Sequence, residues 1–230
     1  MILPKLQGLT GNQLKLIAMI AMFSDHFGKM FFPSVMLFQY VGRIAFPLFA
    51  YMIAEGCRYT RNRLRYFLLI FVLGLGCSAV YFIFSSSLYQ NILLTFSLSI
   101  ACVFATDAFL RDKRPLTAFL MAGALLATVF LTLVLPHFVN GFAFDYDLYG
   151  ALLPVMFYFI PDKRFKLSAL CLILIVRASI FRGTNIFALF SLPLLLLYNG
   201  KRGKYRLKYL FYIFYPAHLV LLQALAMLIG

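Results

Sequence analysis

Charged residues and tryptophan are what this sequence lacks most. Aspartate, glutamate, lysine and arginine together make up 12% of the 230 residues, and tryptophan is absent. A soluble domain carries about 25% charged residues, so an ordinary soluble enzyme is excluded. Hydrophobic residues reach 63%, and 14 tyrosines are available as anchors at a membrane interface. The composition therefore predicts an integral membrane protein.

The sequence also lacks the motifs of several common chemistries. It has no GxxxxGK, GxGxxG or GxSxG pattern, so ATP-driven chemistry and serine-hydrolase catalysis are unsupported. Its four cysteines lie in or beside apolar runs without CxxC spacing: Cys57, Cys77, Cys102 and Cys171. That pattern predicts buried thiols rather than a disulfide framework or a zinc site, and no metal is expected.

Nine apolar stretches are the main feature that the sequence does have. They cover residues 14–32, 37–57, 66–84, 91–110, 115–135, 148–160, 167–181, 185–198 and 208–228. Most are long enough to cross a bilayer as helices, and the sixth to eighth are shorter or interrupted. We therefore predict an all-α, polytopic membrane bundle of about nine transmembrane helices, forming a single domain over residues 1–230. No small-residue cleavage site follows the first stretch, so it is expected to remain as a helix.

The net charge of +14 is interpreted as membrane topology rather than nucleic-acid binding. If the N-terminus is cytoplasmic, seventeen of the 21 basic residues lie near it or in loops that stay inside. Those loops read "RYTRNRLR", "RDKR", "PDKRFK" and "NGKRGKYRLK", whereas the outer connections hold a single arginine. Because cytoplasmic loops collect Lys and Arg, the N-terminus is predicted inside and the C-terminus outside.

The segment "MFSDHFGKMFF" places Asp25, His26 and Lys29 within the first apolar stretch. Ionisable residues inside a membrane indicate a functional site by default. Asp25 and Lys29 are four residues apart on one helix face, so mutual neutralisation is the plain alternative. His26 lies about 100° around the helix from Asp25 and is not needed for that pair. It is our candidate for a catalytic base.

Arg43 and His218 are the other catalytic candidates. Arg43 lies about six residues below the same outer surface as His26, so the two are expected at a similar depth on neighbouring helices. His218 follows Pro216 near the middle of the last stretch. A lone histidine is more often a satisfied core group, but two at a similar depth favour a shared polar cavity. We expect Asp25 to bias the tautomer of His26, and Arg43 or His218 to stabilise an oxyanion.

Binding residues are predicted on both sides of the membrane, each with a plain structural alternative. The candidates for the acceptor site are Lys29, Glu55, Asn91 and Asp145. The plain alternative is an ion pair for Lys29, with Asp25, and for Glu55, with Arg58. For Asn91 it is helix capping, and for Asp145 an ordinary loop position. The candidates for holding a cofactor's phosphates are Arg58, Arg61, Asn62, Arg63, Lys201 and Arg202. Arginine forks bind phosphate well, although topology and anionic lipid also account for such loops.

Four segments resemble the TraX family of integral membrane proteins. They read "LTGNQLKLIAMIAMFSDHFG", "GRIAFPLFAYMIAEGCRYTRNR", "LPLLLLYNGKRG" and "FYIFYPAHL". The resemblance is specific over about residues 12–65 and 187–222, whereas about 70–180 are similar mainly in hydropathy. The family is named for an enzyme that N-acetylates conjugative pilin. It is similar to broader transmembrane acyltransferases, including heparan-α-glucosaminide N-acetyltransferase.

The resemblance implies a multi-pass N-acetyltransferase in the bacterial inner membrane. It implies acetyl-CoA as the donor and an amine or hydroxyl acceptor, such as a peptide or pilin-like N-terminus. Carried over to matching positions, His26 becomes the catalytic histidine and Arg43 the arginine of the second helix. Glu55, Arg61, Asn62, Lys201 and His218 also match the family's motifs.

Two alternatives remain open from the sequence. An ion- or proton-coupled transporter would also place ionisable groups within the membrane, although no internal repeat is found. A non-catalytic scaffold leaves those groups unexplained. The acceptor, N- versus O-acetylation, direct transfer versus an acetyl-histidine intermediate, and the oligomeric state are likewise left open.

Overall fold

The computed structural model describes residues 8–180, 184–205 and 207–229, and this part of the chain is all-α. At least one helix lies in each predicted apolar stretch. The helices are α1 (Gly11–Phe31), α2 (Met36–Gly42), α3 (Ala45–Tyr59), α4 (Arg63–Ser85), α5 (Ile92–Asp112), α6 (Pro115–Val129), α7 (Leu135–Phe138), α8 (Asp147–Phe159), α9 (Lys163–Ile180), α10 (Ser191–Leu196) and α11 (Lys208–Ile229). A π-helical segment, Phe130–Val134, joins α6 to α7, and a 3₁₀ helix, Thr184–Phe190, precedes α10.

Five helical stretches in the described residues are long and apolar enough to cross a membrane. They are Met36–Tyr59, Arg63–Ser85, Ile92–Asp112, Pro115–Phe138 and Tyr209–Leu228. Asp147–Phe159 and Thr184–Leu196 are apolar but shorter. The all-α membrane fold is therefore confirmed, whereas nine crossings and the sides of the two termini stay predictions.

The chain packs as two compact units. Unit 1 comprises Met1–Met52 and Asp162–Gly230, and unit 2 comprises Ile53–Pro161. Unit 1 therefore joins the two ends of the sequence and contains α1, α2, α9, α10 and α11. Whether the two units fold together as one domain, as the sequence predicts, stays a prediction.

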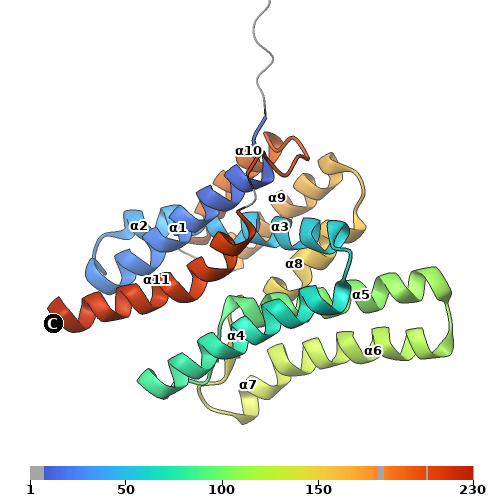
Figure 1. Ribbon diagram of the computed structural model, residues 1–230, viewed down its shortest axis with the longest axis horizontal. Helices are drawn as coiled ribbons and strands as arrows, with labels where there is room; N and C mark the ends of the chain where they lie inside the picture. The colour runs from blue at the N-terminus through green and yellow to red at the C-terminus, as the bar shows by residue number, and fades with distance from the viewer. Residues whose placement is uncertain (1–7, 181–183, 206, 230) are drawn as a thin grey trace, which may run out of the picture. The chain divides into compact units, whose positions relative to one another are not determined.

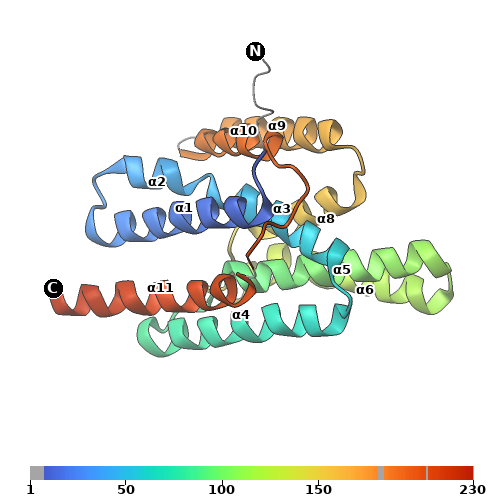
Figure 2. The ribbon, with the colours of Figure 1, turned by 45° about the horizontal axis from the view of Figure 1, so that its top comes forward.

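In unit 1, α1 and α2 form a tight antiparallel hairpin, with α11 on another side of α1 (Figures 1 and 2). Glycine makes the close approach within the hairpin feasible. A Cβ on Gly28 would overlap Phe38, and a Cβ on Gly42 would overlap the side chain of Asp25. Small residues at such crossings let helix backbones pack closely in membranes. The α1–α2 contact thus depends on these two glycines.

We expect Gly28→Ala to destabilise the protein, because the added methyl group meets the Cβ and ring of Phe38. Overpacking of this kind costs about 1–3 kcal/mol. The measurement is thermal unfolding in detergent micelles. The matched control is Gly76→Ala in α4, where nothing lies within 4 Å of the new Cβ. That control should be neutral or slightly stabilising, and equal effects of the two changes would contradict the packing argument.

A break separates α2 from α3 at Arg43 and Ile44. Pro47 explains it, because proline has no N–H and its ring crowds the carbonyl of the residue four positions earlier. That residue is Arg43. The proline therefore places Arg43 at an interruption of the apolar stretch Met36–Tyr59.

The start of α1 is held by a loop from the other end of the chain. Thr10 and Gln13 form a reciprocal capping box. The backbone N–H groups of Gly11 and Asn12 donate to the carbonyls of Lys201 and Arg202, at 2.8 and 2.9 Å. The first N–H groups of a helix have no acceptor within the helix, and here backbone carbonyls of the loop accept from them. The basic loop is fixed against α1 within unit 1.

In unit 2, α5 packs against α4, α6 and α8. A short parallel pair of strands, β1 (Tyr89–Gln90) and β2 (Ala143–Phe144), joins the segment before α5 to the segment before α8. All four cysteines are free; Cys57, Cys77 and Cys102 are buried as predicted, whereas Cys171 is half-buried.

Candidate functional site

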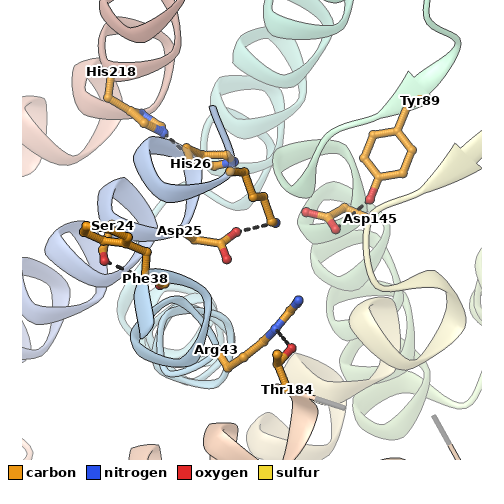
Figure 3. Close-up of polar contacts among 10 residues, drawn as sticks. Ser24, Asp25, His26, Phe38, Arg43, Tyr89, Asp145, Thr184 and His218 are labelled. Carbon is orange, nitrogen blue, oxygen red and sulfur yellow. Dashed lines mark hydrogen bonds and ion pairs between the residues drawn. The ribbon is translucent and has the colours of Figure 1, made fainter. Parts of the chain in front are cut away.

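The first and last helices of unit 1 bring two histidines together. Nδ1 of His26, on α1, lies 3.1 Å from Nε2 of His218, on α11, across 192 positions of sequence. Figure 3 shows the two rings pointing toward each other. His218 is only 3% exposed, and His26 is half-buried. The structure thus places both predicted histidines in one site.

Neighbouring aromatic rings fix the orientation of His218. Phe214 stacks on the His218 ring with a centroid distance of 4.6 Å and an interplanar angle of 8°. Tyr215 meets the same ring edge-on at 5.5 Å. Nδ1 of His218 lies 2.8 Å from the carbonyl oxygen of Phe214. A ring held in this way is preorganised for its partner.

These two hydrogen bonds define the tautomers of the histidine pair when both rings are uncharged. A carbonyl oxygen only accepts, so Nδ1 of His218 must carry the hydrogen and donate it to Phe214. Nε2 of His218 is then an acceptor, which requires the hydrogen of His26 on Nδ1. Nε2 of His26 is left with a free lone pair. A lone pair of this kind is what a general base or a nucleophile needs.

Asp25 lies beside His26 in the sequence but contacts other groups. Its Oδ2 forms an ion pair with Nζ of Lys29 at 2.5 Å, so the predicted mutual neutralisation is present. The carboxylate packs against the backbone of Gly42 in α2. Oδ1 is buried and has no hydrogen-bond partner among the described residues. Among the described residues His218 forms a hydrogen bond with His26, and Asp25 does not.

Arg43 is anchored by a residue that the sequence did not suggest. Its Nε donates to Oγ1 of Thr184 at 2.8 Å (Figure 3). Nearby, Tyr40 of α2 stacks on Phe187 at a centroid distance of 4.0 Å. No direct bond joins Arg43 to His26 in the described part of the chain. Gly42 precedes Arg43 and packs on Asp25, so the backbone of Arg43 lies close to Asp25 on α1.

Comparison with known proteins places the chain in a family. The sequence profile of the TraX protein family matches residues 10–226, which include both histidines. The chain belongs to the TraX family. This TraX-family protein is also 26% identical to the "Probable fimbrial assembly protein FimC, serogroup H1" of Dichelobacter nodosus, over 91% of this chain and 93% of that protein. No solved structure matches it.

In unit 2 of this TraX-family protein, two of the predicted cofactor-binding arginines are engaged in packing. Arg58 pairs with Glu55 at 2.8 Å and donates to the carbonyl oxygen of Tyr158, at the end of α8. Arg63 pairs with Asp107. These contacts support the plain structural alternative for Glu55 and give both arginines a role in holding unit 2 together.

The remaining inner-loop candidates are more accessible. Arg61 and Asn62 are exposed, and the side chain of Asn62 caps α4 by accepting from the backbone N–H of Arg65 at 2.8 Å. Lys201 and Arg202 are exposed on the loop that caps α1 in unit 1. Their backbones are fixed while their side chains face outward. Of the predicted phosphate ligands, Arg61, Lys201 and Arg202 are therefore available to a ligand.

Asn91 and Asp145 organise the connections of unit 2. Asn91 is 2% exposed, caps α5 through Leu93 and donates to the carbonyl of Gly74. Asp145 accepts a hydrogen bond of 2.7 Å from the hydroxyl of Tyr89. Burial and the adjacent Asp145 carboxylate raise the pKa of Tyr89 well above its ordinary value, so the phenol stays protonated and donates. These contacts support the structural alternatives for both residues.

Proposed function

We propose that this protein is a membrane acetyltransferase that transfers the acetyl group of acetyl-CoA to an amine or hydroxyl acceptor, with His26 as the reacting residue. The observation that carries the proposal is the His26–His218 hydrogen bond, which leaves Nε2 of His26 free. Membership of the TraX family supports it. The proposal includes a bacterial inner membrane location, with the basic loops on the cytoplasmic side.

Two balanced routes fit this geometry. In direct transfer, the acceptor attacks the acetyl carbonyl carbon while Nε2 of His26 takes its proton. The carbon–sulfur bond breaks, and the proton leaves with coenzyme A as its thiol. In the two-step route, Nε2 itself attacks and the CoA thiolate departs, while His218 Nε2 takes the Nδ1 proton of acetylated His26. As the acceptor then displaces His26 from the acetyl group, His218 returns the proton to Nδ1 of His26, and the proton lost by the acceptor completes the thiol of CoA.

Arg43 is suited to stabilise the negative charge that develops on the carbonyl oxygen. Thr184 holds its Nε, and its two terminal nitrogens form no hydrogen bond to the described residues. Guanidinium groups aimed at developing charge in a dry site are effective because they need no reorganisation. The acceptor's identity is a separate question. The name of the Dichelobacter relative refers to fimbrial assembly, which makes a pilin N-terminus one acceptor to test.

The test uses purified protein in detergent micelles with acetyl-CoA labelled in its acetyl group. We expect release of CoA, and tryptic mass spectrometry should find any acetylated intermediate on the peptide that contains His26. Label that stays on CoA in the presence of amines and water alike would contradict the proposal. Uptake of a solute by reconstituted vesicles without CoA release would favour the transporter instead.

The basic loop provides a prediction about donor binding. Because Lys201 and Arg202 are exposed and their backbones are fixed to α1, replacing both with alanine should raise the KM for acetyl-CoA by about tenfold, with kcat little changed. Steady-state CoA release measures this. Lys113→Ala, at another exposed basic position, is the matched control. A fall in kcat at unchanged KM would mean that the phosphates bind elsewhere.

A further inference from the structure

The loop that carries Lys201 and Arg202 is held in a defined shape. Gly200 and Gly203 adopt φ angles of 74° and 105°, in the left-handed region that favours glycine. The side chain of Asn199 accepts from the backbone N–H of Lys201 at 2.9 Å, which closes an Asx turn. A loop that serves only membrane topology needs positive charge and no particular shape. The fixed shape of this loop therefore calls for another explanation.

Asn12, at the start of α1, is bonded to both ends of the second half of the loop. Its backbone N–H donates to the carbonyl oxygen of Arg202 at 2.9 Å. Its side-chain amide donates to the carbonyl oxygen of Tyr205 at 2.7 Å. Asn12 is only 7% exposed, and a Cβ on Gly203 would lie 3.1 Å from its Nδ2. The asparagine thus packs against the turn of residues 202–205 and fixes it to α1.

These contacts leave the charged side chains of the loop accessible to an anionic ligand. Lys201, Arg202 and Lys204 are exposed, and none of them pairs with an acid in the described part of the chain. The carbonyl oxygens of Lys201, Arg202 and Tyr205, which would repel a phosphate, accept hydrogen bonds from α1 instead. Cations on a fixed loop also lose less conformational freedom on binding than cations on a flexible one.

We propose that Asn12 is a positioning residue for the acyl donor, because its side-chain amide holds the loop so that Lys201 and Arg202 meet the phosphates of acetyl-CoA together. This inference rests on the proposed acetyltransferase function. It adds a residue that acts through the two cations rather than on the donor itself. Since a buried amide also contributes to stability, donor affinity has to be measured beside thermal unfolding.

The test compares Asn12→Leu with Gln13→Ala in purified protein in detergent micelles. Leucine has nearly the shape of asparagine but no N–H to donate to Tyr205. Gln13→Ala weakens the same helix start by removing the capping box with Thr10, and it leaves the Asn12–Tyr205 hydrogen bond in place. We expect Asn12→Leu to raise the KM for acetyl-CoA about three- to tenfold with kcat little changed, the effect of losing one hydrogen bond. Gln13→Ala should lower thermal stability and leave KM unchanged.

A double-mutant cycle with the two cations identifies the route of the effect. If Asn12 acts through Lys201 and Arg202, Asn12→Leu should change KM less than about twofold when both cations are already alanine. An additive increase in KM would overturn the proposal. Equal effects of Asn12→Leu and Gln13→Ala on KM, or a loss of kcat at unchanged KM, would overturn it as well, because Asn12 would then serve stability alone.

Gly203→Ala probes the same contact from the loop and does not alter the buried start of α1. Its added Cβ would lie 3.1 Å from both Nδ2 of Asn12 and Oγ1 of Thr10, so the turn has to move away from the asparagine. The same rise in KM is expected, also where Asn12→Leu fails to fold, and an unchanged KM would contradict the proposal. Absence of acetyl-CoA turnover in the wild-type protein contradicts the acetyltransferase function itself, whereas turnover with a normal KM in both variants contradicts only the role of Asn12.

Discussion

Replacement of His26 by alanine is expected to lower acetyl transfer by about 10²–10⁴-fold, the usual contribution of a positioned general base. A larger loss is expected if His26 carries the acetyl group, because the variant then has no covalent route. The reason lies in the histidine pair, where Nε2 of His26 is the free acceptor. The measurement is release of CoA in the presence of an amine, with thermal unfolding as the check on folding.

His137 supplies the matched control for His26. It is an exposed histidine on α7, in unit 2, and the mechanism assigns it no role. His137→Ala should transfer acetyl at the wild-type rate. Near-normal turnover by His26→Ala would rule out the assignment, and an equal loss in both variants would show that the assay responds to stability rather than chemistry.

The helices of this protein could be predicted from hydropathy, because in a bilayer every backbone polar group must be satisfied within its own helix. The last helix was expected over residues 208–228 and runs from Lys208 to Ile229. The interruption of the helix at Arg43 was harder to predict from the sequence. Pro47 indicated a freed carbonyl, yet the sequence could not show that α2 would end five residues earlier, at Gly42, which packs against Asp25.

The sequence could predict which residues belong to the candidate site, but it could not predict which of them contact one another. His26 and His218 could be predicted as site residues because imidazoles are rare in apolar helices. Their direct contact spans 192 residues and results from packing between α1 and α11, which local patterns do not encode. Thr184, the partner of Arg43, gave no signal, because a threonine in an apolar segment has many uses. The sequence also predicted that Asp25 biases the tautomer of His26, whereas the Asp25 carboxylate pairs with Lys29 and His26 forms its hydrogen bond with His218.

The inner-loop arginines show a related limit. Arg58, Arg61 and Arg63 are equivalent in a count of positive charges, and all three were candidates for binding phosphate. In the structure, acids of unit 2 pair with Arg58 and Arg63, through Glu55 and Asp107. Each of those ion pairs depends on the direction in which the side chains point, and the charge pattern contains no information about that direction. The pattern therefore predicts which loops are basic, and the fold decides which cations remain for a ligand.

His218→Leu is expected to reduce kcat by about 10²-fold or more, although His218 need not touch the substrate. Without an acceptor at the position of Nε2, His26 loses the hydrogen bond by which His218 favours its hydrogen on Nδ1. The imidazole then populates the tautomer that carries its hydrogen on Nε2, which cannot act as a base. The effect should appear in kcat rather than in the KM for acetyl-CoA, because the donor's phosphates are proposed to bind elsewhere.

His218→Gln distinguishes this positioning role from packing alone. The amide oxygen of glutamine reaches the place of the histidine Nε2 and can accept the Nδ1–H of His26, so this variant should keep much of the activity that His218→Leu loses. Both changes remove the ring that stacks on Phe214 and meets Tyr215 edge-on, so a purely structural role predicts equal losses of thermal stability and activity. Rescue by glutamine at similar stability would show that the acceptor atom, rather than the ring, is what His26 requires.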